Sequence, residues 1–94
     1  MYIDSGADRV IHGVVTQGRA QLHDTQWVTG YKVHVYRNGW VQVLNEAGSW
    51  YFSGNNNQNT QVRHRFRYPV TTRYVKFTPL YWSTHMSMRA GLLT

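Results

Sequence analysis

The sequence predicts an all-β protein, built as an antiparallel sandwich or jelly roll, and three observations support this. Apolar and polar side chains alternate along most of the chain, as in half-buried strands. Turn-forming residues separate these runs, and Asn38-Gly39 between two alternating segments indicates a β-hairpin. No helical stretch with proper caps appears. Two packed sheets would protect the edges of so many strands.

The N-terminal half supplies two of the clearest strand predictions. Residues 10–16 are apolar on both faces, which is typical of a central strand. In residues 31–36, Tyr31, Val33 and Val35 share one face, and polar side chains share the other. Trp27 and Trp40 are expected to start strands and to pack in the core or at its rim. Turns are expected at residues 4–6, 37–39, 47–49 and 53–57.

The C-terminal part predicts two alternating strands joined by a loop. Val75 and Phe77 mark the apolar face of the first strand, and residues 86–92 alternate in the second. The predicted loop, residues 80–85, presents an indole, two aliphatic hydroxyls and an imidazole. Regular strands need no such side chains for folding, so this loop is the first place to look for function.

Composition limits the class of protein. The chain has 94 residues, which suggests a single domain over 1–94 with a modest core. It has no cysteine, which excludes disulfides, thiolate metal sites and a cysteine nucleophile. No signal-peptide pattern is present, and no apolar run approaches the roughly 20 residues of a transmembrane helix.

The charge balance is basic, with ten Lys and Arg against four Asp and Glu. Such a balance invites a nucleic-acid or anionic-membrane interpretation. However, Arg63, Arg65 and Arg67 alternate with other residues, as expected of a solvated strand face that also protects a sheet edge. We therefore expect no nucleic-acid partner and only weak membrane contact.

Nothing in the sequence indicates catalysis or a cofactor. The histidines are scattered, and no spacing places two of them beside a carboxylate as metal ligands. No pair of acidic residues has the placement needed for glycosidase chemistry, and no Gly-x-Ser-x-Gly motif occurs. We expect neither an enzyme nor a metal site, and no cofactor.

Two loops carry the remaining candidates, residues 16–27 and residues 80–85. In the simpler interpretation Arg19 and Asp24 form a stiffening ion pair and Trp82 caps the core. In the other, both loops converge at one end of the sandwich. Arg19 and Asp24 would then bind vicinal hydroxyls while Trp82 stacks on the apolar face of a ring. Periodicity alone leaves both interpretations open.

Four collinear segments resemble the discoidin domain family, the coagulation factor five/eight C-terminal type. Residues 14–19 (VVTQGR) are similar to its hydrophobic-Thr-Gln-Gly signature, and residues 24–33 (DTQWVTGYKV) to its DQWVTSYKV stretch. Residues 53–62 resemble its TGNTDRNTVV segment, and residues 73–89 its closing ARYVRI, PLxW and HISLR wording. Together the matches are specific and cover nearly the whole chain.

The resemblance implies an eight-stranded antiparallel jelly roll that binds ligands with loops at one end and is rarely catalytic. Members bind galactose-type sugars, anionic phospholipids, collagen or growth factors, usually outside the cell. The wording is closest to discoidin-type lectins, which favours a carbohydrate-binding module acting in adhesion. By position, the ligand-binding residues are Arg19, His23, Asp24, Trp82, Ser83, Thr84 and His85. Only Leu22 could contact a membrane as a hydrophobic spike.

The departures from the family pattern suggest a partial domain, truncated at the N-terminus. Family domains run to roughly 150 residues, and the opening strands and the first ligand loop have no counterpart here. A monomer built this way would leave a sheet edge and some core exposed. We therefore hypothesise a homo-oligomer or a complex with a separate N-terminal fragment; the alternative is a smaller, repacked sandwich.

Three function classes follow. The first is a lectin whose partner is a sugar or glycoprotein, the second a module that adheres to anionic membranes or acidic proteins through Leu22 and the three arginines. The third is a truncated or engineered discoidin fragment whose main property is folding and self-assembly.

Overall fold

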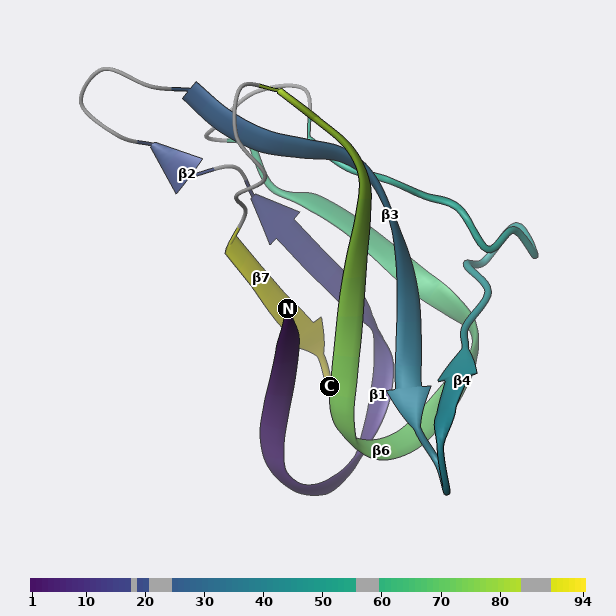
Figure 1. Ribbon diagram of the computed structural model, residues 1–94. Helices are drawn as coiled ribbons and strands as arrows, with labels where there is room; N and C mark the ends of the chain where they lie inside the picture. The colour runs from purple at the N-terminus through teal and green to yellow at the C-terminus, as the bar shows by residue number, and fades with distance from the viewer. Residues whose placement is uncertain (18, 21–24, 56–59, 84–88) are drawn as a thin grey trace.

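The computed structural model describes residues 1–17, 19–20, 25–55, 60–83 and 89–94. Throughout these ranges the regular structure is β-strand, and every strand pair is antiparallel, as the sequence predicts (Figure 1). No helix that could cross a membrane occurs among the described residues. The strands are β1 (Tyr2–Gln17), β2 (Arg19–Ala20), β3 (Thr25–Tyr36), β4 (Trp40–Gln42), β5 (Phe52–Ser53), β6 (Val62–Ser83) and β7 (Arg89–Leu93).

The two longest strands, β1 and β6, organise the sheet. Its order is β2-β3-β6-β1-β7, with β4 and β5 also paired to β3. β6 pairs with β1 from Val62 to Lys76 and with β3 from Val75 to Ser83, so one strand serves two neighbours. Both long strands curve strongly in Figure 1. Register shifts in β1, at residues 4–9 and 11–13, accompany this curvature.

The core is one cluster of apolar side chains enclosed by the curved strands. The predicted inward residues of β3 are all buried, as are Val75 and Phe77 of β6. The ring of Tyr31 lies 5.5 Å from that of Phe52 and 5.7 Å from that of Phe77, so aromatic contacts join β3, β5 and β6. The full cluster is Ile11, Val14, Val28, Tyr31, Val33, Val35, Val43, Phe52, Phe66, Val75 and Phe77.

Several local predictions are confirmed. β3 and β4 form the expected hairpin, with Asn38 and Gly39 at positive φ, which an Asn-Gly pair adopts readily. The apolar segment 10–16 lies within β1, and its residues 13–16 lie between β6 and β7. Arg63, Arg65 and Arg67 are exposed, as a solvated strand face requires.

Three local predictions are wrong. The turn expected at residues 4–6 does not end a strand, because β1 continues through it. Gly6 takes a positive φ, and its N–H donates to Asp4 Oδ1. The pairing of β1 with β6 is interrupted after Asp4 and resumes at Arg9. The loop expected at residues 80–85 is strand up to Ser83, since β3 continues as its partner. Trp40 starts β4 as predicted, but it is 42% exposed and belongs neither to the core nor to the residues packed against it.

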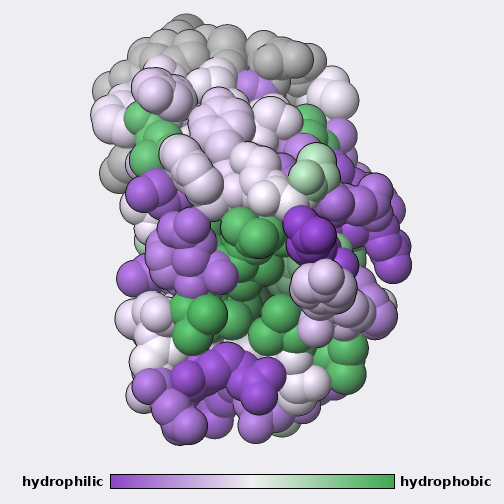
Figure 2. Space-filling view, turned by 90° about the vertical axis from the view of Figure 1, so that its right-hand side faces the viewer, coloured by the Kyte–Doolittle hydropathy of each residue, from purple (hydrophilic) through white to green (hydrophobic). Residues whose placement is uncertain are grey.

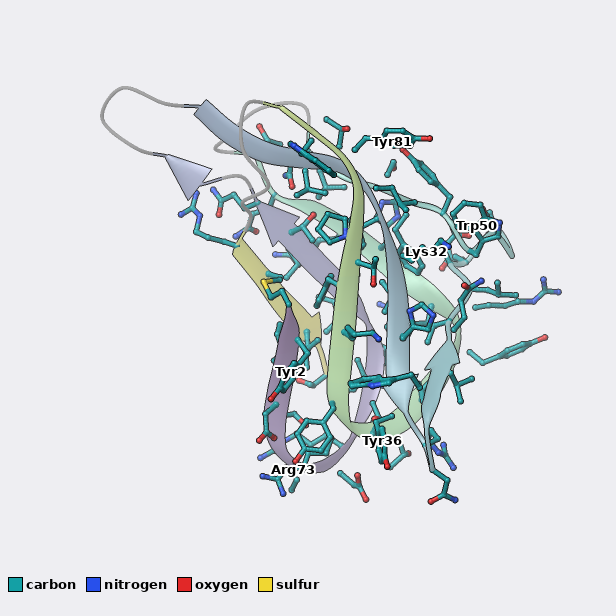
Figure 3. The ribbon with its side chains drawn as sticks, viewed as in Figure 1. Tyr2, Lys32, Tyr36, Trp50, Arg73 and Tyr81 are labelled. Carbon is teal, nitrogen blue, oxygen red and sulfur yellow. The ribbon has the colours of Figure 1, made fainter. Side chains whose placement is uncertain are left out.

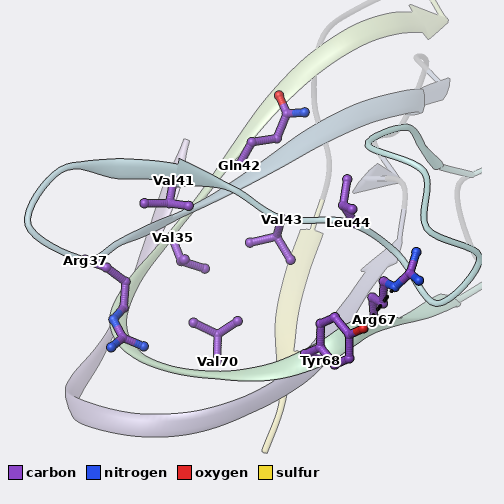
Figure 4. Close-up of a pocket in the computed structure, with 9 residues that line it drawn as sticks. All are labelled: Val35, Arg37, Val41, Gln42, Val43, Leu44, Arg67, Tyr68 and Val70. Atoms are coloured by element: carbon purple, nitrogen blue, oxygen red, sulfur yellow. Dashed lines mark hydrogen bonds between the residues drawn. The ribbon is translucent and has the colours of Figure 1, made fainter.

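An apolar groove opens between the β3–β4 hairpin and β6. Val35, Val41, Val43, Leu44 and Val70 line it, with a volume of about 450 Å³ (Figure 4). Arg37, Gln42, Arg67 and Tyr68 complete its lining. Figure 2 shows hydrophobic side chains gathered in a hollow with hydrophilic ones around it. This groove is the kind of uncovered apolar surface that the sequence led us to expect.

Candidate functional site

Strand pairing gathers several chain segments at one end of the sheet, which we call the loop end. β2 pairs Arg19 with Gln26 and Ala20 with Thr25, so residues 21–24 connect two strands that are hydrogen-bonded neighbours. Beside them, β6 pairs Trp82 with Val28 and Ser83 with Trp27. Both predicted ligand loops therefore leave the sheet at the same end, at the top of Figure 1.

The remaining strands meet at this end as well. β7 begins at Arg89, which pairs with Gln17 at the end of β1. The end of β6 at Ser83 and the start of β7 at Arg89 therefore lie at the same end of the sheet. Val62, the first residue of β6, pairs with Thr16 and brings another segment to the same edge. The loop end is thus built on a continuous hydrogen-bonded base.

Asn55 fixes that base from within. Its side chain is fully buried, and Nδ2 donates to the carbonyl oxygens of Thr16 at 3.1 Å and Thr60 at 2.6 Å. Its backbone N–H donates to the Val28 carbonyl at 2.8 Å. One residue thereby ties β1, β3 and the segment before β6 together directly beneath the loop end.

The described residues place only part of the predicted site. Trp82 is 50% exposed, and with Leu80 and Tyr81 it lines a hollow of about 230 Å³. An exposed indole beside an apolar hollow can stack on a flat ligand. Arg19 and Ser83 are placed by their backbone positions in β2 and β6. Leu22, His23, Asp24, Thr84 and His85 lie outside the described residues.

Sequence reasoning missed an aromatic group that continues from this hollow. Tyr81 is exposed and its ring lies 6.4 Å from that of Tyr51, which in turn lies 6.1 Å from Trp50. The Lys32 ammonium stands 5.1 Å from the Trp50 ring, and Figure 3 shows Tyr81, Trp50 and Lys32 on this side of the sheet. Gly30 makes the arrangement possible, since a Cβ there would collide with the Tyr51 ring. In the sequence, the feature that could have indicated this group is the adjacent aromatic pair Trp50-Tyr51.

The arrangement suits binding rather than bond-breaking. Exposed aromatic rings, an apolar hollow and polar backbone ends at strand termini provide stacking and hydrogen bonds. The described residues hold no group of three His, Asp or Glu side chains that could bind a metal ion.

Comparison with known proteins identifies the family to which the chain belongs. A scan against protein families matches residues 1–92 to the F5/8 type C domain. Mouse (Mus musculus) lactadherin is 30% identical over 95 residues, which make up 99% of this chain and 20% of lactadherin. Mouse retinoschisin is 32% identical over 98 residues, covering 99% of this chain and 42% of retinoschisin.

A solved structure gives the same result. Wild-type discoidin II from Dictyostelium discoideum superimposes with a TM-score of 0.73 at 30% identity, covering 93% of this chain and 34% of that one. The chain thus spans less than half of each of these three proteins. It belongs to the F5/8 type C, or discoidin, domain family, whose members bind carbohydrates or membranes.

Proposed function

We propose that this chain is a carbohydrate-binding module without catalysis, that it takes galactose-type sugars at the loop end, and that it serves in extracellular adhesion. The observation that carries the proposal is the convergence at that end of the segments bearing the predicted ligand residues, beside the half-exposed Trp82. Family membership adds support, since carbohydrates are among the ligands that its members bind.

Each residue has a defined task in this proposal. Trp82 stacks on the apolar face of the sugar ring, where the ring quadrupole attracts polarised C–H bonds. Arg19 and Asp24 bind a pair of neighbouring hydroxyls as donor and acceptor. His23, Ser83, Thr84 and His85 add hydrogen bonds around the ring.

A glycan array probed with the chain and with Trp82→Ala tests this function. We expect binding to galactose- or N-acetylgalactosamine-terminated glycans, competed by the free sugars and lost in the variant. Trp40→Ala is the matched control, because Trp40 is 42% exposed and pairs with Tyr36 at the end of β3 opposite Val28, the partner of Trp82. An array without signal, or full binding by Trp82→Ala, would refute the proposal.

A membrane function is the second candidate, and the exposed arginine row on β6 favours it. Arg63 lies one residue from Val62, which pairs with Thr16 at the loop end, and Arg65 and Arg67 follow at alternate positions. Binding to vesicles with an anionic lipid, weakened by salt because exposed charges are screened beyond about 10 Å at 0.1 M, would identify this function. Leu22 would then be the residue that enters the lipid.

Self-association would strengthen either activity. A single sugar site of this kind is expected to be weak, so several linked copies would be needed for adhesion. We propose that the apolar groove lined by Val41 and Leu44 is covered by a second copy, since these two side chains are exposed in the single chain. Sedimentation equilibrium should show a dimer or larger species that Val41→Lys dissociates. A monomer at micromolar concentration would contradict the proposal.

A further inference from the structure

A second aromatic site lies at the end of the sheet opposite the loop end. Four neighbouring strands each contribute one ring: Tyr2 from β1, Tyr74 from β6, Tyr36 from β3 and Trp40 from β4. The rings form a closed circuit, with centroid separations of 6.5 Å (Tyr2–Trp40), 5.5 Å (Trp40–Tyr36), 6.3 Å (Tyr36–Tyr74) and 6.0 Å (Tyr74–Tyr2). They enclose a hollow of about 290 Å³, which we call the aromatic hollow.

These rings do not serve the core. They project from the face of the sheet opposite Val33, Val35 and Val75, and Tyr2, Tyr36 and Trp40 are all exposed. Neighbouring rings in the circuit are inclined by between 55° and 86°, so they stand as walls rather than as a stack. A group seated among them would lie within about 6 Å of every ring, the range of ring-quadrupole interactions.

A polar cavity adjoins the aromatic hollow. Tyr36 and Tyr74 line both, and the second cavity has a volume of about 420 Å³. Its other lining residues are polar or charged: Asp8, Arg37, Asn38, Thr71 and Arg73. Figure 3 shows Tyr2, Tyr36 and Arg73 together at the lower end of the view, far from the loop end. An aromatic and a polar compartment thus share one wall.

Cations dominate the electrostatics of this region. The Lys76 ammonium lies 4.6 Å from the Trp40 ring centroid, and the Arg73 guanidinium 5.2 Å from that of Tyr74. Arg73 is oriented by two hydrogen bonds to Asp4, of 2.8 and 3.1 Å, so its position is fixed. The Arg37 guanidinium makes no hydrogen bond or ion pair with any residue that the structure describes. It is therefore available to an anionic ligand.

From this geometry we propose that the aromatic hollow and its polar neighbour bind an acidic saccharide, a pyranose linked to a uronic acid. The neutral pyranose stacks among the four rings through its C–H faces. The carboxylate of the second sugar pairs with Arg37, in the planar two-bond geometry that guanidinium and carboxylate share. Asn38, Thr71 and Asp8 contact its hydroxyls. This site is separate from the loop end and does not depend on the function proposed for it.

Charge selects this ligand over a quaternary ammonium group, the other common guest of aromatic walls. Two of the four rings already hold a cation, and Arg37 stands beside them. A further cation would be repelled, whereas an acidic sugar complements both this region and the overall net charge of +6.

Two-dimensional ¹H–¹⁵N NMR of the full chain tests the proposal directly. The four tryptophans, Trp27, Trp40, Trp50 and Trp82, give four indole signals. The probe is a glucuronic-acid-containing disaccharide, compared with its neutral methyl ester and with tetramethylammonium. We expect the acidic probe to shift the Trp40 signal and to leave those of Trp50 and Trp82 unchanged.

Variants then assign the two compartments. Trp40→Ala and Arg37→Ala should each weaken binding of the acidic disaccharide by at least about tenfold, and the methyl ester should bind the unchanged chain as weakly as the acid binds Arg37→Ala. Trp50→Ala and Arg63→Ala are the matched controls, because both residues are exposed and lie outside the two compartments. Their affinities should not change.

Three outcomes would overturn the inference. No shift of the Trp40 signal would show that the rings bind no such sugar. A larger shift with tetramethylammonium than with the acid would show a cation site. Loss of binding in Trp82→Ala, with Trp40→Ala unaffected, would place the acidic sugar at the loop end. Galactose binding on the array is independent of all three, so the two proposals can fail separately.

Discussion

Asn55 shows at the scale of one residue how the loop end is held. Replacing it with Ala leaves the carbonyls of Thr16 and Thr60 without the donor that both share. Because Thr16 is buried and water cannot readily replace the Asn55 amide at its carbonyl, we expect the free energy of unfolding to fall by about 1–3 kcal/mol. Urea denaturation measures the change.

Gln42→Ala is the control for the Asn55 substitution. Gln42 carries the same kind of amide group but is exposed on the short strand β4. Exposed substitutions usually change stability by less than about 0.5 kcal/mol. Equal unfolding curves for the two variants would show that the buried amide of Asn55 contributes no more to stability than an exposed amide does.

At the scale of the element, β3 carries a pH-sensitive position on its outer face. His34 pairs directly with Lys76 of β6 and lies two residues from Lys32. Partial burial, followed by the charges of Lys76 and Lys32, lowers the pKa of His34 below its ordinary value. The unfolded chain therefore binds a proton more readily than the folded one.

The sign of the pH effect follows from this difference. The contribution of His34 to stability is fully present above about pH 6.5, the ordinary imidazole value, and is lost as pH falls from there through the lowered pKa of the folded state. We expect His34→Gln to flatten the dependence of unfolding free energy on pH between about 7.5 and 5. Denaturant titrations at several pH values measure it, with His12→Gln on β1 as control. An unchanged slope in His34→Gln would contradict the assignment.

Element boundaries show what the sequence could and could not predict. The β3–β4 hairpin was predictable because Asn38-Gly39 meets a local backbone requirement. The extension of β6 to Ser83 was not, because it depends on β3 remaining available as a partner beyond Pro79. Proline is tolerated there because β1 no longer pairs with this part of β6, which leaves one side of the strand without a ladder to interrupt.

The Trp82 site and the aromatic hollow also differ in how far the sequence could predict them. Trp82 could be singled out because it follows a regular strand within a family motif. The aromatic hollow could not, since Tyr2, Tyr36, Trp40 and Tyr74 lie on four different strands and none of them alone indicates that the other three are its neighbours. Only the register of four strands, which depends on the irregularity at Gly6 and on the hairpin, brings the rings together.

At the scale of the whole molecule, a single core makes the domain sensitive to one large cavity. Phe77 is fully buried at the centre of the cluster, pairs with Val33 and lies 5.7 Å from the Tyr31 ring. Phe→Ala substitutions in cores destabilise by about 3–5 kcal/mol. A chain of this length is expected to have only about 5–14 kcal/mol in total, so Phe77→Ala should remove a large share.

That loss should appear as one cooperative transition at lower temperature, because β1, β3 and β6 all contribute to the same cluster and cannot loosen separately. Circular dichroism and tryptophan fluorescence should report the same midpoint for Phe77→Ala. Tyr68→Ala is the control, since Tyr68 is 68% exposed and its removal leaves the core intact. Separate midpoints for the two probes would show instead that the part of the sheet around β1 and β7 unfolds independently of the β3–β6 part that carries Trp82.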